Sequence, residues 1–498
     1  MRVRYQRGPA MSGGGDETVD EIRSCYEPTR PQWRQPLSDL AVIAAVVAVV
    51  LGAWSASPVT GAAFGVVSAC LVRTLDEVTP RWMLVVVVVA GALAGFRGHH
   101  ELAGLEPARL GAFEGWVQVM GDPRPAGSST RLVVRVDGQR YEAWSRSEDE
   151  QRRVAQLQGG QWVNLRGELI RLTPARAERV AWQHVVGQIR LHEVGDRSPG
   201  SPMAQASNEI RRSVERASSL LGEPGDALYR GLVIGDRRGQ PDHMVGRFRA
   251  SGLSHLTVVS GLNVALLLVL VGPAVRALRP WSRWIATLLL IAWFAGLTRF
   301  EPSIVRAGAM AALSATAFML GRDRAPFRVL CVAVALLVLV DPLLVHSVGF
   351  WLSVGATAGV CTAGPWLADR LQVLGPLAAP LGITVGAQIG VVVPLVATFG
   401  HLPLVSVPAN LLAVPVASLV KLYGLPAGLV AGWVPPLAEP LMFPCRVGVR
   451  WVDGVAAVAE RLEPGGAVTW IGWGVLAVGL GALVARYGVG DGGAPPHR

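Results

Sequence analysis

The feature that most constrains this chain is a series of apolar stretches, each approaching the length that a helix needs to cross a lipid bilayer. They recur from residue 40 to near the end of the chain, separated by short connections rich in charge, proline or glycine. A spanning helix needs about 20 mainly apolar residues. Only 16% of the 498 residues are charged, against about 25% in soluble domains. The sequence therefore predicts a mainly α, polytopic helical membrane protein.

The apolar stretches fall into two groups on either side of a long polar region. Three precede it, at 40–56, 59–72 and 83–96, and eight follow it, at 253–278, 284–297, 303–320, 329–340, 348–361, 380–399, 404–419 and 468–484. Prolines between residues 403 and 436 are expected to break the later region into pieces. Arginines gather in alternate connections, and positive charge marks cytoplasmic loops. This pattern predicts a cytoplasmic N-terminus.

The polar region has the periodicity of strands. Segments such as WVQVM, RLVVRVDG and QWVNLRGELIRL alternate apolar and polar residues between Gly, Pro and Asp, as short β-strands do. Five or so strands in about a hundred residues fit a small β-barrel. Three preceding spans place this domain outside the cytoplasm.

The predicted organisation has seven parts. They are a disordered cytoplasmic tail (1–37), three transmembrane helices (38–97), an extracytoplasmic β domain (98–200), an amphipathic linker helix (201–222), a large transmembrane domain (223–440), an interfacial helix with the last span (441–485) and a disordered tail (486–498).

Polar side chains interrupt the apolar stretches of the second half, and lipid makes such residues costly enough to suggest function. They are Ser254, His255, Ser260, Asn263, Arg306, Ser353, Gln388 and Asn410. On the geometry of one helix over 253–278, Ser260 and Asn263 share a face with Leu256. Arg306 costs about 2.5 to 3.5 kcal/mol on insertion scales, which favours a pore or a buried ion pair over the alternative that its side chain snorkels to the interface. Asp341 and Lys421 are predicted to anchor span ends at the interface.

Several of these candidates have an alternative, purely structural interpretation. Serines taken singly often pack membrane helices together, and a lone histidine such as His255 is often a hydrogen-bonded structural residue. The net charge of +10 suits nucleic acid or anionic lipid as a partner, but loop arginines that set membrane orientation account for much of it.

No motif predicts an enzyme. The nine histidines form neither H-x-H-x-D-H nor H-E-x-x-H, and the chain has no G-x-x-x-x-G-K-[ST] loop. The five cysteines include no Cys-x-x-Cys pair. We therefore predict no catalytic residue, no metal, no cofactor and no ATP hydrolysis by this chain.

Ordered blocks of the second half resemble the ComEC family of competence proteins. They are GLVIGDRRG, FRASGLSHLTVVSGLNVALL, PSIVRAGAMA, DPLLVHSVGFWLSVGATAGV and AQIGVVVPLVATFGHLPLVSVPANLLAVPV, which cover most of residues 225–435. Residues 37–200 also look like the family's three spans and extracytoplasmic OB-like domain. Asn263 stands where the family pattern SGLHV has histidine, and Trp351 where GFQLS has glutamine. An amide at residue 263 still donates and accepts hydrogen bonds.

The resemblance implies a bacterial inner-membrane channel that passes single-stranded transforming DNA into the cytoplasm during natural competence, with 223–440 as the channel domain. It implies single-stranded DNA, membrane lipids, a DNA receptor and a cytoplasmic ATPase or helicase as partners. Longer family members continue into a metallo-β-lactamase-like domain that is absent here, so a separate nuclease is a further expected partner. A secondary transporter of a small solute and a non-conducting scaffold for uptake components remain alternatives.

On the channel hypothesis, the eight polar residues line or brace the DNA path, and Arg306 is the foremost phosphate contact. The OB-like domain adds a basic and aromatic set, because such folds bind single strands through charge and stacking. This set is Arg131, Arg135, Tyr141 and Trp144. Aromatic residues of a small barrel can equally belong to its core or to the membrane interface.

Overall fold

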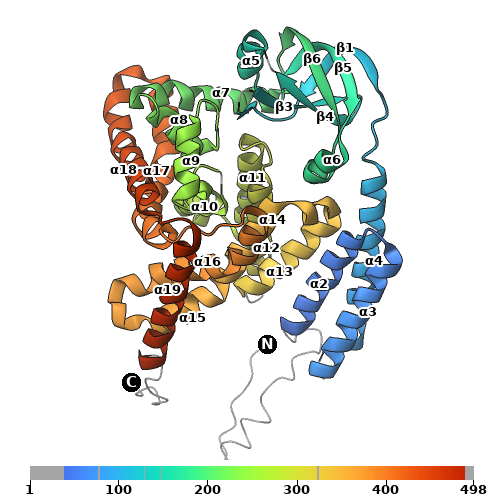
Figure 1. Ribbon diagram of the computed structural model, residues 1–498, viewed down its shortest axis with the longest axis vertical. Helices are drawn as coiled ribbons and strands as arrows, with labels where there is room; N and C mark the ends of the chain where they lie inside the picture. The colour runs from blue at the N-terminus through green and yellow to red at the C-terminus, as the bar shows by residue number, and fades with distance from the viewer. Residues whose placement is uncertain are drawn as a thin grey trace, which may run out of the picture.

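The computed structural model describes residues 39–487, except 77–78, 128, 146, 259 and 322–324. The predicted tail at 1–37 and most of the tail at 486–498 lie outside the described residues. Helices make up most of the described chain, and a small sheet lies at one end of it (Figure 1). The prediction of a mainly α protein is confirmed.

The first three helices form a bundle that glycines hold close. They are α2 (Asp39–Ser55), α3 (Pro58–Leu75) and α4 (Arg81–Ala103), and they occupy the three apolar stretches before the polar region. A Cβ added at Gly61 would lie 2.3 Å from the carbonyl oxygen of Gly91, so only hydrogen fits there. Small residues allow such close backbone approach between membrane helices.

The polar region folds into one sheet. Its strands among the described residues are β1 (Gly111–Val119), β2 (Arg124–Ala126), β3 (Ser129–Val136), β4 (Gln139–Ser145), β5 (Trp162–Arg171) and β6 (Val185–Ser198). They run in the order β1-β5-β6-β4-β3-β2. Strands β4 and β6 are parallel, and the other pairs are antiparallel. A short pairing also joins β1 to β3, opposite Gln118 and Val119.

Alternation along the strands explains the core of the sheet. Leu132, Val134 and Val136 of β3 are buried, whereas the residues between them are partly exposed. Helix α5 (Glu148–Ala155) follows β4, and α6 (Pro174–Val180) with the short turn η2 (Ala181–Gln183) joins β5 to β6. This topology places the β1–β2 connection and η2 at the side that faces the helices.

The second half is helical throughout its described residues. Its α-helices are α7 (Pro202–Ser218), α8 (Gly225–Ile234), α9 (Asp242–Ala250), α10 (Gly261–Arg276), α11 (Pro280–Leu297), α12 (Pro302–Met319), α13 (Pro326–Val340), α14 (Val348–Cys361), α15 (Ala363–Arg370), α16 (Ala378–Phe399), α17 (Ser406–Trp433), α18 (Ala438–Leu462) and α19 (Gly466–Tyr487). Helix α7 runs between the sheet and the pair α17 and α18 (Figure 1).

Six helices among the described residues are long and apolar enough to cross a membrane. They are Pro58–Leu75, Arg81–Ala103, Pro280–Leu297, Gln372–Phe399, Ser406–Trp433 and Gly466–Arg486. Their large apolar side chains are often exposed, including Val393 of α16 and Val478 of α19. Lipid is the medium in which such a surface is stable. The chain is therefore a multi-pass membrane protein.

The prediction of one helix over 253–278 was wrong. The chain forms the short turn η4 (Ser254–Leu256), and α10 begins only at Gly261. Ser260 is the extended residue before the helix, with φ −120° and ψ 169°. Ser260 and Asn263 therefore do not share a helical face with Leu256, because η4 ends at Leu256 and α10 begins only at Gly261. Glycine and serine in this stretch favour such an interruption.

Glycines also allow a close backbone contact in the second half. Gly355 and Gly359 of α14 face Gly386 and Gly390 of α16. A Cβ added at Gly359 would lie 1.9 Å from the carbonyl oxygen of Gly386. We call these four residues the glycine seam. The two helices touch backbone to backbone, as small residues spaced four apart permit.

Candidate functional site

Five apolar helices contact one another in a closed sequence. Helix α10 contacts α12, α12 contacts α14, α14 contacts α16, α16 contacts α17, and α17 returns to α10. We call them the five-helix ring. Each contributes at least one polar residue predicted from the sequence, as Asn263, Arg306, Ser353, Gln388 and Asn410 show in that order. The ring therefore collects side chains that are spread over about 150 residues of sequence.

Arg306 and Ser353 meet between α12 and α14. The side chain of Arg306 is buried, and the residue is only 2% exposed. Its Nη2 donates a hydrogen bond to Ser353 Oγ and a longer one, at 3.4 Å, to the carbonyl of Ser303. Its Nη1 has no partner among the described residues, and no carboxylate there forms an ion pair with it. The structure thus places a buried cation without a counter-charge in the ring.

Gln388 and Asn410 meet at Ser406 between α16 and α17. Gln388 Nε2 donates to Ser406 Oγ at 2.9 Å, and Asn410 Nδ2 donates to the Ser406 carbonyl at 2.7 Å. Ser406 was not predicted. It lies at the start of α17, where carbonyl and hydroxyl groups bind amides that would otherwise be unsatisfied in an apolar setting.

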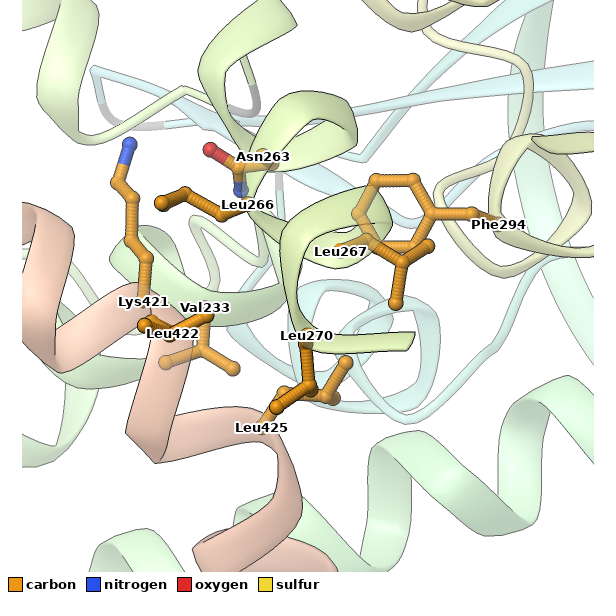
Figure 2. A pocket seen from close by; sticks show the side chains of 9 residues that line it. All are labelled: Val233, Asn263, Leu266, Leu267, Leu270, Phe294, Lys421, Leu422 and Leu425. Carbon is orange, nitrogen blue, oxygen red and sulfur yellow. The ribbon is translucent and has the colours of Figure 1, made fainter. Parts of the chain in front are cut away.

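Asn263 and Lys421 lie at a small cavity between α10, α8 and α17 (Figure 2). Asn263 Nδ2 donates to the carbonyl of Leu232 at 3.4 Å, and Ser260 Oγ donates to Asn263 Oδ1 at 3.4 Å. The cavity measures about 20 Å³, which is room for roughly one water molecule. In Figure 2 the amino group of Lys421 and the amide of Asn263 lie toward one end of the cavity, and Leu270 and Leu425 lie toward the other.

The prediction that Lys421 anchors a span end was wrong. Helix α17 continues through Pro415 and Pro426 to Trp433, so Lys421 lies within it. The residue is 6% exposed, and its Nζ has no hydrogen-bond partner among the described residues. Proline is tolerated inside a membrane helix where neighbouring helices cover the freed backbone groups, and α7, α8 and α18 all contact α17.

Ser254 and His255 lie outside the ring helices, in η4. Both residues are exposed, and His255 Nδ1 lies 3.3 Å from the carbonyl of Gly252. Gly252 packs on Ser406, since a Cβ there would lie 2.5 Å from the serine Cβ. The loop that carries Ser254 and His255 therefore lies beside the Gln388 and Asn410 cluster.

The residues predicted as DNA contacts in the sheet differ in their surroundings. Tyr141 is 1% exposed, and its hydroxyl donates to the carbonyl of Arg109 at 3.2 Å, so it is a core residue and cannot stack on a base here. Trp144 is partly exposed and lies under the Arg176 guanidinium, 5.3 Å from the ring centre. Arg131 forms an ion pair with the buried Glu142, and Arg135 is partly exposed.

A second and much larger cavity lies between the sheet and the helices. It measures about 430 Å³. Several aromatic and acidic residues line it together with six arginines. The arginines are Arg124, Arg131, Arg140, Arg211, Arg237 and Arg299. Pro302 and Val305 of α12 and Phe350 of α14 also line it, so two ring helices form part of its wall. Sequence analysis did not foresee this cavity.

A buried ion-pair network beside the cavity fixes the sheet to the helices. Asp122, in the connection between β1 and β2, forms ion pairs with Arg211 of α7 and with Arg299, which precedes α12. Arg211 also lies 3.9 Å from Asp236, which pairs with Arg238 at 2.7 Å. We call these five residues the ion-pair network. His184 adds a separate link, with Nε2 3.1 Å from Asp341 Oδ1.

Both carboxylates of the network are held ionised. Burial alone would raise the pKa of Asp122, but Arg211, Arg299 and the Gly159 N–H, which donates to it at 3.0 Å, hold that pKa well below its usual range. Burial would likewise raise the pKa of Asp236, but the hydrogen bonds and charge of its arginine neighbours lower it. The charged forms of both groups therefore stabilise the folded state.

Acid is expected to weaken this network. A carboxyl with a depressed pKa contributes stability that is present above its unfolded pKa, about 3.9, and is lost as the pH falls through the folded value. The thermal unfolding midpoint of wild type should therefore exceed that of Asp236→Asn by a constant amount from pH 7 to about pH 5, and the gap should narrow below about pH 4. A gap that stays constant down to pH 3 would contradict this account.

Within the described part of the chain, no group of three or more His, Cys, Asp or Glu side chains is placed to hold a metal ion. What the arrangement offers is charge, with amides and hydroxyls. Arginine cations together with amide and hydroxyl groups suit the binding of an anion.

Comparison with known proteins gives a consistent picture. The chain is 26% identical over 215 residues to ComE operon protein 3 of Bacillus subtilis, covering 43% of this chain and 27% of that protein. It is 30% identical over 312 residues to competence protein ComA of Neisseria gonorrhoeae, covering 60% of this chain and 44% of that protein. It is also 26% identical over 233 residues to the uncharacterized protein YcaI of Escherichia coli, covering 44% of this chain and 31% of that protein.

The matches span less than half the length of each of these relatives. No solved structure matches the chain significantly. The model of the competence protein family matches residues 232–488, just over half of the chain and all five helices of the ring. The chain therefore belongs to the competence protein family.

Proposed function

We propose that this protein conducts single-stranded DNA across the bacterial inner membrane into the cytoplasm during DNA uptake, through the five-helix ring. The observation that carries the proposal is Arg306, a buried cation with an unpartnered Nη1 and no carboxylate partner among the described residues. A guanidinium in lipid is costly unless it serves a polar path. Phosphodiesters are ligands that its planar fork binds well.

The other ring residues fit a polar path for a strand that keeps moving. Asn263, Gln388 and Asn410 offer amides, which can hydrogen-bond a phosphate without binding it as tightly as a charge does. Ser353 holds Arg306 in place. One strong charge with several neutral donors allows binding and release, as conduction requires.

The sheet supports the second part of the proposal, an OB-like platform outside the membrane. Its parallel pair β4 and β6, the helix α5 between β4 and β5, and the short β1 to β3 pairing fit a five-stranded, partly open barrel with β2 as an extension. Such folds bind single strands through basic grooves and aromatic stacking. Arg135 and Trp144 are partly exposed and are the residues of the predicted set that can do so.

The proposal includes an orientation and partners. The N-terminus faces the cytoplasm and the sheet faces outward, so that the strand meets the sheet before the ring. A DNA receptor delivers the strand, and a cytoplasmic ATPase or helicase draws it in. Any degradation of the other strand falls to a separate nuclease, since we assign this chain no enzymatic activity.

Uptake of labelled DNA tests the proposal. The expected result is loss of cytosolic DNA label that resists added nuclease. We expect this loss in a deletion strain and in an Arg306→Ala strain whose membrane expression equals that of wild type. Arg306→Lys should restore part of the uptake, because it keeps the charge but loses the planar fork. Wild-type uptake in the deletion strain would refute the channel and favour a transporter or a scaffold.

The matched control is Arg276→Ala, which removes an exposed arginine at the end of α10. It changes the net charge by the same amount but touches no ring contact. We expect near wild-type uptake from it. Equal loss in both variants would mean that charge at the membrane, rather than Arg306, controls uptake.

A further inference from the structure

We infer that the 430 Å³ cavity between the sheet and the ring is a binding seat for one or two nucleotides of a single strand, with Arg140 and Arg237 as its phosphate contacts. The inference rests on the proposed function and names where the strand is held before it meets the ring. Pockets for drug-sized ligands measure roughly 300 to 1,000 Å³. The cavity therefore suits a short piece of backbone with its bases.

The position of the cavity links the sheet to the ring. Its lining includes residues of β3, β4 and η2 from the sheet, and residues of α12 and α14 from the ring. Val305 lines it, and the next residue along α12 is Arg306. A strand held here lies between the proposed platform and the proposed path.

Two of the six arginines that line the cavity form no ion pair with a described residue. Four of its six arginines form ion pairs with carboxylates; these are Arg124, Arg131, Arg211 and Arg299. Arg140 and Arg237 are the other two, and the carboxylates that act on them, Asp341 and Glu301, lie beyond ion-pair distance. Arg140 Nη1 donates to the carbonyl of Gln183 at 3.0 Å, which orients its guanidinium without neutralising it. An anion is the ligand that such a pair of cations attracts.

The backbone around the cavity is strained in a way that points to function. Five non-glycine residues of the described chain have positive φ, and three of them line this cavity. They are His184, Arg299 and Phe300, at φ 56°, 61° and 52°. Residues held in this region cost free energy and cluster at binding sites. The tandem turn at 299–300 places the Phe300 ring at the cavity while Arg299 enters the ion-pair network.

Two aromatic residues can stack on bases. Trp182 of η2 and Phe300 line the cavity from opposite domains, and Phe300 is 62% exposed. The exposed Phe300 ring leaves a face free to stack on a base. Base stacking on such rings tolerates any sequence.

Salt titration of DNA binding tests the seat. The probe is a fluorescent oligothymidylate binding to the full chain in nanodiscs of zwitterionic lipid. Binding to single strands weakens with salt, with a slope of about 0.7 per neutralised phosphate. The double variant Arg140→Ala/Arg237→Ala is expected to lower that slope by about 1.4 and to weaken low-salt binding at least about tenfold. The control is Arg152→Ala/Arg212→Ala, which removes two exposed arginines and should leave the slope unchanged.

Phe300→Ala gives a second test that does not depend on charge. Its exposed ring contributes little to folding, so the variant should unfold at the wild-type temperature. Loss of one stacked base should weaken binding about tenfold and leave the salt slope as in wild type. Wild-type affinity and slope in the arginine double variant, or no oligonucleotide binding by wild type, would overturn the seat. Uptake in the deletion strain is the separate result that overturns the channel.

Discussion

Asp122→Ala is expected to destabilise the joint between sheet and helices by about 3 to 5 kcal/mol, because it leaves Arg211 buried without its nearest counter-charge. The Arg211 side chain is 4% exposed, so water cannot replace the lost carboxylate. Arg299 loses a partner at 3.4 Å at the same time. The measurement is the thermal unfolding midpoint of the purified chain in detergent, followed by tryptophan fluorescence, with limited proteolysis to detect loosening of the sheet.

The control for this prediction is Asp149→Ala on α5, which removes an exposed carboxylate of the same domain. Surface charges of this kind contribute about 0 to 1 kcal/mol, so its midpoint should stay within a degree or two of wild type. If Asp122→Ala unfolds at the wild-type temperature, the ion-pair network does not hold the sheet in place.

Gly386→Leu is expected to separate α14 from α16. Gly386 lies so close to its neighbours that an added Cβ would sit 2.8 Å from the Gly359 carbonyl oxygen of α14 and 2.6 Å from the Gly364 amide nitrogen of α15. Overpacking a well-packed site costs about 1 to 3 kcal/mol and occasionally more, and here the obstacle is backbone, which cannot move aside as a side chain can. We expect poor membrane yield and a midpoint lowered by many degrees.

Gly479→Leu is the matched comparison. It places the same side chain in another apolar helix, α19, where nothing lies within 4 Å of an added Cβ. It should express and unfold like wild type. Equal damage from both substitutions would show that any leucine in place of a membrane glycine is harmful, and the glycine seam would then have no special role.

Much of the fold could be predicted from local pattern. Helices α2, α3 and α4 are each one unbroken apolar stretch, and the strands alternate as a half-buried sheet must. Interruptions were harder to predict. Average hydropathy does not indicate that α10 begins only after Ser260. Nor does it indicate that α17 continues past Pro415, where neighbouring helices cover the freed carbonyls.

The candidate site was predictable only in part. Arg306 and Ser353 could be selected singly because each is polar in an apolar stretch, but their contact depends on how α12 packs on α14. The large cavity joins Arg140 to Arg237, and the network joins Asp122 to Arg299 over 177 residues of sequence. A local sequence pattern does not predict contacts between residues so far apart in the chain. They follow from the topology that sets the sheet on the helices.

The ion-pair network also determines how the sheet can move. A domain on a flexible tether would present its ligand to the membrane at an effective concentration set by the length of the tether. Here the connection between β1 and β2 is fastened to α7 and to the turn before α12 by buried charges. These ion pairs therefore hold the sheet in a fixed position on the helices. On the proposed function, a pull on a bound strand would be carried from the sheet to the helices through these ion pairs.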